Sequence, residues 1–105
     1  MKKKIYISIP ISGHDYAAQK KMAETIAAEY RSKGHYVITP FEIIREDDPF
    51  RLDYSYCMGR DIEQLLRCDA VLFVGNYEDS KGCMLEFEAA RIYNKEIMHT
   101  THNPH

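Results

Sequence analysis

The sequence has few cysteines, no long hydrophobic run and no excess of one charge, and each shortage excludes a class of protein. Three cysteines, Cys57, Cys68 and Cys83, are too few and too scattered for a disulfide framework or a zinc site. Because reduced thiols without a secretion signal are typical of the cytoplasm, we expect a cytoplasmic location. A net charge of −2 offers no field that would hold a nucleic-acid polymer or an anionic membrane, so any phosphate must be bound by local groups.

The apolar stretch near the amino end is short. Residues 5–11 follow three lysines but are interrupted by Tyr6, Ser8 and Pro10. A membrane span needs about 20 predominantly apolar residues, and a signal peptide needs a continuous apolar region. We therefore expect neither a signal peptide nor a membrane span.

Strand-like and helix-like segments alternate along the 105 residues, a length that suits one domain. Strands are predicted over residues 4–9, 35–39, 70–75 and 96–98, and helices over residues 15–33, 53–67 and 82–93. A loop with room for one helical turn is expected over residues 41–52, and a loose tail over residues 98–105. Because βαβ crossovers are right-handed, this order predicts a single α/β domain over residues 1–105, with a doubly wound, mostly parallel sheet and a central third strand.

Two acidic residues fall within the apolar faces of predicted helices. At about 100° per residue, Glu86 lies in the middle of the apolar arc of the third helix, whereas Glu88 lies on the opposite side with Arg91. Asp61 has a similar position in the second helix. The apolar neighbours of Glu86 are Gly82, Cys83, Leu85, Ala89, Ala90, Ile92 and Tyr93, and those of Asp61 are Tyr54, Cys57, Met58, Leu65 and Cys68. An ionised carboxylate is seldom buried without a partner or a task, so Glu86 and Asp61 are candidate functional residues.

Paired carboxyl groups at the edge of a core suit glycosyl transfer. One carboxylate attacks the anomeric carbon, and the other acid, kept protonated by partial burial, protonates the leaving group. The alternative for either acid alone is structural, as a loop cap or as the partner of an arginine at the core rim. Two such acids, on helices that flank one strand, favour the functional interpretation.

Two loops are candidates for substrate binding, because open α/β sheets bind ligands beyond the carboxyl ends of their strands. The residues concerned are Ser8, Ile9, Pro10, Ser12 and Gly13 after the first strand, and Ser80 and Gly82 after the third. Ser80 and Gly82 open a helix whose N–H groups and dipole favour an anion, and an N-cap role for Ser80 is compatible with this. Neither loop is a GxGxxG or Walker motif, so we expect no cofactor.

Histidines and tyrosines have mostly structural interpretations. His99, His102 and His105 could hold a metal at i, i+3 spacing only in a helix, and a loose tail is expected there instead, so we expect no metal site. Tyr6 lies in the first strand within reach of the binding edge, where a core residue is more common than a catalyst. The others considered, Tyr16, Tyr30 and Tyr36, are interpreted as packing residues.

Three motifs follow one another along the chain in a characteristic order: Ile5-Tyr6-Ile7-Ser8-Ile9-Pro10, Arg60-Asp61-Ile62 ahead of Cys68-Asp69-Ala70-Val71, and Ser80-Lys81-Gly82-Cys83-Met84-Leu85-Glu86 followed by Ala90. Together, over residues 4–98, they resemble the nucleoside 2-deoxyribosyltransferase superfamily, which includes 2′-deoxynucleoside 5′-phosphate N-hydrolases and small bacterial and phage members. The resemblance implies a flavodoxin-like fold, a nucleoside or nucleotide as the small-molecule partner, and a homodimer or higher homo-oligomer.

The resemblance also implies roles for individual residues. Glu86 matches the family nucleophile, Asp61 the acid that assists base departure, Tyr6 the tyrosine that orients the nucleophile, and Ser80 a serine that touches the 5′-phosphate. Ile9 stands where the family usually has a glycine. The leading hypothesis is retaining cleavage or transfer of the N-glycosidic bond of a nucleoside or nucleoside 5′-monophosphate. The alternatives are a non-catalytic nucleotide or ADP-ribose sensing module, which Ile9 favours, and a scaffold whose acids are structural.

Overall fold

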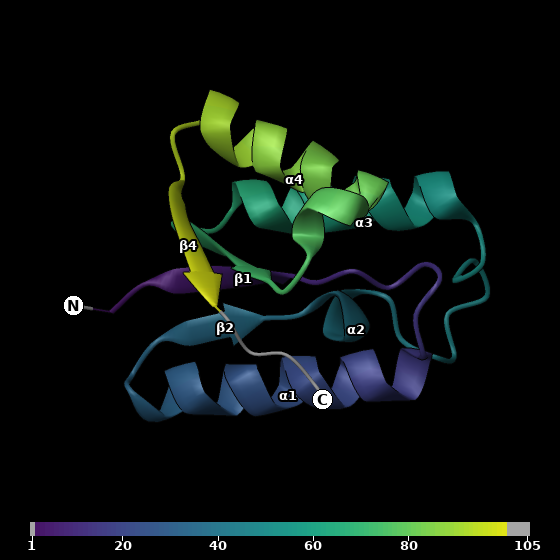
Figure 1. Ribbon diagram of the computed structural model, residues 1–105, viewed down its shortest axis with the longest axis horizontal. Helices are drawn as coiled ribbons and strands as arrows, with labels where there is room; N and C mark the ends of the chain where they lie inside the picture. The colour runs from purple at the N-terminus through teal and green to yellow at the C-terminus, as the bar shows by residue number, and fades with distance from the viewer. Residues whose placement is uncertain (1, 101–105) are drawn as a thin grey trace.

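Four apolar segments form the sheet of the computed structural model, which describes residues 2–100 (Figure 1). The strands are β1 (Lys4–Ser8), β2 (Tyr36–Ile38), β3 (Ala70–Val74) and β4 (Glu96–Thr100). They pair in the order β2-β1-β3-β4, and every pairing is parallel. β3 lies inside the sheet and is buried along its whole length, which suits its uninterrupted apolar sequence. The doubly wound, flavodoxin-like sheet with an interior third strand is thereby confirmed.

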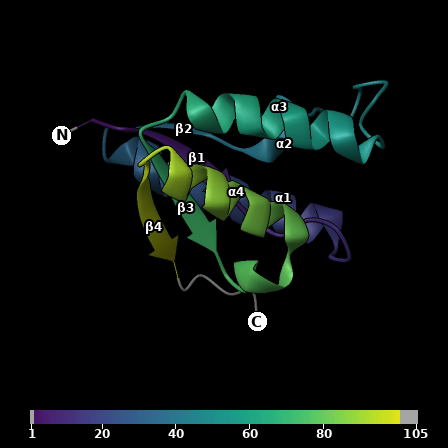
Figure 2. The same ribbon diagram turned by 90° about the horizontal axis from the view of Figure 1, so that it is seen from above.

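Helices cover both faces of this sheet, with α1 on one side and α3 and α4 on the other (Figures 1 and 2). The helices are α1 (Tyr16–Ser32), α2 (Pro40–Ile43), α3 (Tyr54–Leu66) and α4 (Lys81–Ile92), with a single 3₁₀ turn, η1 (Tyr77–Asp79), before α4. Asp15, Asp53 and Ser80 each accept a backbone N–H at the start of a long helix, which fixes where α1, α3 and α4 begin. Within residues 2–100, none of these helices has the length and apolar character needed to cross a membrane.

The sheet divides the core into two layers, and the alternation of β1 decides which side chains enter each layer. Ile5 and Ile7 face α1, where they pack with Ile26. Tyr6 and Ser8, at the alternate positions, point towards α3 and α4, and both are fully buried. Two polar side chains are thereby placed next to each other beneath α4.

The carboxyl-terminal strand is longer than predicted. Met98, His99 and Thr100 pair with Leu72, Phe73 and Val74 of β3, so residues 98–100 are not a loose tail. β4 lies at the edge of the sheet, where alternate positions remain exposed and can be polar. The polar residues at this end therefore make the strand hard to predict from the sequence. His102, His105 and the rest of the expected tail lie outside the described residues.

The segment expected as a loop with room for one helical turn does contain such a turn, the four-residue helix α2. The Thr39 side chain accepts the backbone N–H of Glu42, while the Glu42 carboxylate accepts the backbone N–H of Thr39 at 2.9 Å. This capping box, with Pro40 at the first helical position, forms α2. The predicted second strand therefore ends before Thr39, which serves as an N-cap.

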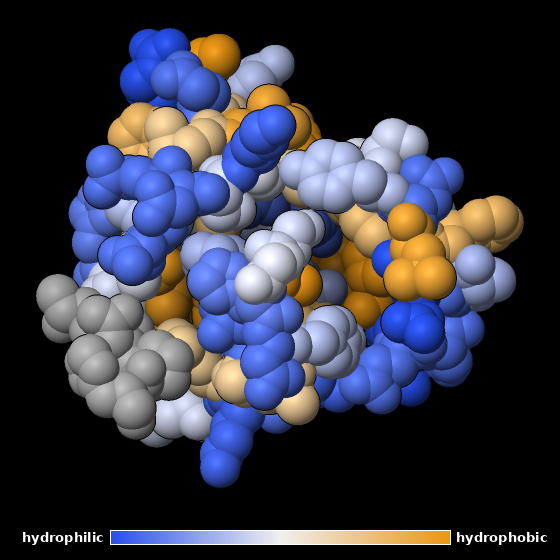
Figure 3. Space-filling model, turned by 45° about the vertical axis from the view of Figure 1, so that its right-hand side comes forward, coloured by the Kyte–Doolittle hydropathy of each residue, from blue (hydrophilic) through white to orange (hydrophobic). Residues whose placement is uncertain are grey.

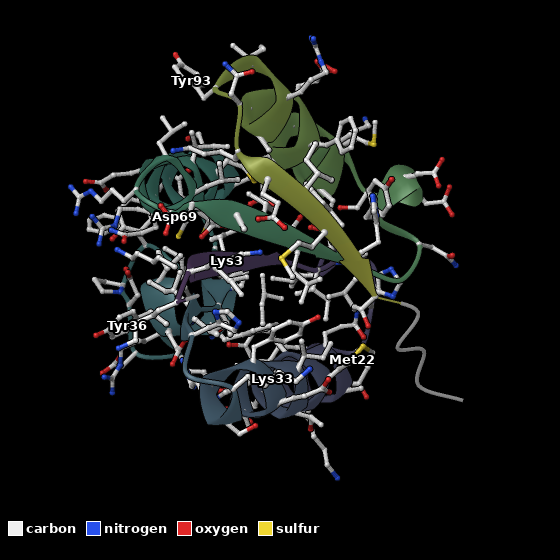
Figure 4. The ribbon with its side chains drawn as sticks, turned by 90° about the vertical axis from the view of Figure 1, so that its left-hand side faces the viewer. Lys3, Met22, Lys33, Tyr36, Asp69 and Tyr93 are labelled. Atoms are coloured by element: carbon white, nitrogen blue, oxygen red, sulfur yellow. The ribbon has the colours of Figure 1, made fainter. Side chains whose placement is uncertain are left out.

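Several apolar residues expected to pack are exposed instead. Tyr36 is 62% exposed, with the Lys2 ammonium over its ring, and Tyr93 is 61% exposed; both lie on the outside of the molecule in Figure 4. Leu85 and Ile92, also assigned to the apolar arc of α4, are more than half exposed. The buried face of α4 is narrower than predicted, because α4 contacts the sheet and α3 through a stripe centred on Glu86.

Candidate active site

A pocket of about 560 Å³ opens at the carboxyl end of the sheet. Its walls come from the segments after β1, β2 and β3 and from the first turns of α3 and α4. β2 lies on one side of β1 and β3 lies on the other. The connections that follow β1 and β2 therefore run in opposite directions across the sheet, and the pocket lies at this topological switch point. Figure 3 shows this side of the molecule hollowed, with hydrophobic residues visible between hydrophilic ones.

Glu86 is held in the wall of this pocket by two side chains of β1. Tyr6 Oη donates to Glu86 Oε2 and Ser8 Oγ donates to Glu86 Oε1, each at 2.6 Å. Glu86 is only 4% exposed, and burial raises its pKa to about 7 although both hydrogen bonds lower it. Burial and the nearby carboxylates raise the pKa of Tyr6 well above its usual range, so its hydroxyl remains a donor at neutral pH.

Asp61 lies in the same pocket without a partner for one of its oxygens. Its Oδ1 atom is buried and forms no hydrogen bond with any described residue. Burial, and then the charge of Glu86, raise the pKa of Asp61 to about 8, against a smaller opposing effect of Arg60. Buried polar atoms are nearly always hydrogen-bonded, so an unpaired one beside an open pocket indicates a ligand partner.

The surroundings of the two carboxyl groups favour ionisation of Glu86 before that of Asp61. Glu86 accepts two hydrogen bonds that lower its pKa, whereas Asp61 Oδ1 accepts none from the described residues and the charge of Glu86 raises the pKa of Asp61. One group is then an oxygen nucleophile or base while the other is a proton donor. Glu88, by contrast, is paired with Arg91 at 2.8 Å on the outer face of α4, as the helical spacing predicts.

The predicted loop residues contribute to the pocket unequally. Ile9 and Ser12 line the pocket, whereas Pro10 and Gly13 are not part of its lining. Ser8 acts through its bond to Glu86. The carbonyl oxygen of Pro10 accepts the Gln19 side-chain amide at 2.6 Å, which ties the start of the loop to α1.

Ser80 and Gly82 line the opposite wall, at the start of α4. Ser80 Oγ accepts the backbone N–H of Cys83 at 3.2 Å, the N-cap role considered from the sequence. A Cβ atom at Gly82 would lie 3.3 Å from Met58 Sδ and 3.4 Å from Tyr54 Oη, so glycine allows the first turns of α3 and α4 to approach closely. Across residues 2–100, no group of three or more His, Cys, Asp or Glu side chains is placed to hold a metal ion.

Sequence reasoning missed the part of the pocket that follows β2. Arg45, Arg51 and Tyr54 line it, and so do the aromatic rings of Tyr16 and Phe41, which pack edge to face at 5.2 Å. The available signal was topological. Residues 40–54 follow a predicted parallel strand and so reach the same edge of the sheet as the other two loops.

Comparison with known proteins places the chain in a family. The chain belongs to the family described as Domain of unknown function (DUF4406), whose model matches residues 3–99. No curated protein matches the sequence. Among solved structures, the fold is similar to that of a 2-deoxyribosyltransferase from Bacillus psychrosaccharolyticus, with a TM-score of 0.72 and 23% identity over 97% of this chain and 77% of that chain. This likeness confirms the flavodoxin-like fold.

Proposed function

We propose that the protein cleaves or transfers the N-glycosidic bond of a nucleoside or nucleoside 5′-monophosphate with retention of configuration. The observation that carries the proposal is the pair of buried carboxyl groups, Glu86 and Asp61, which share one pocket and differ in their hydrogen-bond partners. The fold of the solved 2-deoxyribosyltransferase supports the same chemistry, since that protein serves in nucleoside synthesis.

In the first step, a carboxylate oxygen of Glu86 forms a bond to the anomeric carbon of the sugar while the bond from that carbon to the base nitrogen breaks. The electron pair of the broken bond goes to the base, and the Asp61 carboxyl group gives its proton to the departing base. The product is a glycosyl ester of Glu86, and Asp61 is left ionised. The unpaired Oδ1 of Asp61 supports this role, because the leaving base would provide its missing partner.

In the second step, an acceptor takes the sugar from Glu86. Water gives a hydrolase and a second base gives a transferase. In either reaction the acceptor bonds to the anomeric carbon, the ester bond breaks, and Asp61 receives the proton that the acceptor loses. Both carboxyl groups then return to their starting states.

Tyr6 and Ser8 position the nucleophile. Each donates to a different oxygen of Glu86, which leaves a further lone pair on each oxygen for the sugar. Their bonds also lower the pKa of Glu86 against the effect of burial, so a useful fraction of the carboxylate exists near neutral pH. Because the two residues of β1 hold the Glu86 carboxylate in place, little rearrangement is needed before it attacks the anomeric carbon.

The start of α4 is the proposed place for a 5′-phosphate, if the substrate carries one. The hydroxyl oxygen of Ser80 accepts from the backbone N–H of Cys83, and a hydroxyl group can donate at the same time, so Ser80 can also donate to a ligand that enters the pocket. Lys81 and Gly82, at the start of α4, line the same wall, where the helix dipole favours negative charge.

A nucleotide- or ADP-ribose-sensing module without turnover is the second candidate, and Ile9 is the observation that favours it. Ile9 is buried in the pocket wall, where its branched side chain occupies space that the glycine usual in the family would leave open. A sensing module would bind nucleotides with both acids intact and release no base.

Base release from a panel of nucleosides and their 5′-monophosphates separates these functions. We expect wild-type protein to release base from at least one panel member, Glu86→Gln to release none while still binding it, and Glu88→Gln to match wild type. Chromatography of the free base is the readout. Unchanged turnover in Glu86→Gln would contradict the mechanism, and tight binding without turnover in wild type would favour the sensing module.

A further inference from the structure

Arg51 differs from the other arginines in having no acidic partner in the part of the chain that the structure describes. The other five are all ion-paired: Arg31 with Glu42, Arg45 with Asp47, Arg60 and Arg67 with Glu63, and Arg91 with Glu88. The Arg51 guanidinium makes no hydrogen bond or ion pair with the described residues, although it lines the pocket that contains Glu86. An arginine left without a partner at a pocket wall is available to a ligand, and its planar fork matches the oxygens of a phosphate.

A second cation, Lys81, lines the same pocket and forms no ion pair with the residues from 2 to 100. Arg51 comes two residues before the N-cap of α3, and Lys81 is the first residue of α4. The first turns of these helices lie against each other, because the Gly82 position faces Tyr54 and Met58 of α3. Arg51 and Lys81 are therefore brought to neighbouring parts of the pocket, beside the backbone N–H groups that open α4.

The balance of charge in the pocket supports an anionic ligand. Arg45, Arg51 and Lys81 are its cations, and Asp61, Asp79 and Glu86 are its acids. Burial raises the pKa of Asp61, which stays largely protonated at pH 7, and Glu86 is only partly ionised there. Because Arg45 is paired with Asp47, Arg51 and Lys81 are the pocket cations that remain for a ligand among the described residues, although the whole chain has a net charge of −2.

We propose that Arg51 is a specificity-determining residue that, with Lys81, binds a phosphate of the substrate and selects phosphorylated nucleosides over free nucleosides. This inference rests on the proposed function, since it names the substrate class of the same pocket. It adds a guanidinium contact to the serine and backbone donors at the start of α4. The segment after β2, which carries Arg51, then decides which substrates are accepted, while Glu86 and Asp61 perform the chemistry.

Calorimetric titration of matched ligand pairs tests this proposal. Each natural 2′-deoxynucleoside and its 5′-monophosphate is titrated into Glu86→Gln, which prevents turnover, with and without Arg51→Gln. We expect Arg51→Gln to weaken monophosphate binding about 10-fold or more, because a charged hydrogen-bond pair is lost, and to change nucleoside binding less than about two-fold. Arg51→Lys should bind the monophosphate with intermediate affinity, because lysine keeps the positive charge but lacks the planar guanidinium group that can donate two hydrogen bonds to one phosphate.

Arg67→Gln is the matched control, because Arg67 is an exposed, ion-paired arginine of α3 outside the pocket lining. It should leave both ligands unaffected. Equal weakening of nucleoside and monophosphate by Arg51→Gln would overturn the proposal and indicate contact with the base or sugar, and no change in either would overturn it as well. If no nucleoside or nucleotide binds, the proposed function fails, and inorganic pyrophosphate then tests the anion subsite alone. Arg51-dependent pyrophosphate binding supports the subsite, and its absence overturns it.

Discussion

Replacing Glu86 by glutamine should stabilise the folded protein at alkaline pH. Glutamine has nearly the shape of the protonated acid and can share hydrogen bonds with Tyr6 and Ser8, but it cannot ionise. In the wild-type protein, burial raises the pKa of Glu86 from its ordinary value of 4.5 to about 7. Ionisation of Glu86 is therefore more favourable in the unfolded chain than in the folded one. The wild-type protein loses stability as the pH rises through the range in which Glu86 is ionised mainly in the unfolded chain.

The size of the effect follows from the two pKa values. Below pH 4.5 the side chain is protonated in both states, and glutamine and glutamic acid should give similar stability. Between pH 4.5 and about 7 the unfolded state binds fewer protons than the folded state, so wild-type stability falls as pH rises and then levels off. At 1.36 kcal/mol for each pKa unit, the variant should gain about 3 kcal/mol over wild type by pH 8. Loss of the Glu86 charge also lowers the pKa of Asp61, which adds in the same direction.

Urea denaturation at pH 4, 6 and 8 measures this difference as a change in the unfolding midpoint. We expect equal midpoints at pH 4 and a higher midpoint for Glu86→Gln at pH 8. Glu88→Gln is the control, because Glu88 is solvent-exposed and its pKa is lowered by Arg91, so its replacement should cause a small change of the opposite sign. A midpoint difference between Glu86→Gln and wild type that does not vary with pH would refute the reasoning.

Three further predictions concern residues around Glu86. Tyr6→Phe removes the hydroxyl that donates to Glu86 at 2.6 Å and should raise the pKa of Glu86 by about one to two units. The acidic limb of the pH profile of kcat/KM should then move to higher pH by the same amount. An unmoved limb would exclude Glu86 as the group that must ionise. Asp61→Asn should slow release of natural bases far more than release of nitrophenol-type leaving groups, which depart without protonation, and equal slowing would argue against a proton donor. Ser80→Ala should lower the free energy of unfolding by about 1 kcal/mol through loss of the α4 cap and should weaken phosphate-bearing ligands selectively; denaturation and titration report the two effects separately.

The fold and the acidic pair could be predicted because both depend on local periodicity. Strand-helix alternation fixes a parallel sheet, and the 3.6-residue helical period separates Glu86 from Glu88. The same helical period predicts too wide an apolar face for α4. Periodicity contains no information on how much of a helix surface is covered by its neighbours in the fold. Leu85 and Tyr93 are exposed for this reason.

The rest of the pocket depends on tertiary arrangement. Arg51 and Tyr54 belong to a segment without periodicity, and their position follows only from the place of β2 in the sheet. The link between Tyr6, Ser8 and Glu86 joins residues about 80 positions apart, although the two-residue period of β1 puts Tyr6 and Ser8 on one face. The pKa of Asp61 depends on burial and on the charge of Glu86, which no local pattern reveals.

The covalent intermediate on Glu86 is the central claim, and mass spectrometry after rapid acid quenching tests it most directly. The protein is mixed with the nucleoside or nucleotide that it turns over fastest, quenched within the first turnovers and digested. We expect the peptide that contains Glu86 to gain the mass of the sugar moiety, in wild type and in Glu88→Gln but not in Glu86→Gln. Turnover in which the sugar is attached to another residue, or in which the product has inverted configuration, would contradict Glu86 as the nucleophile.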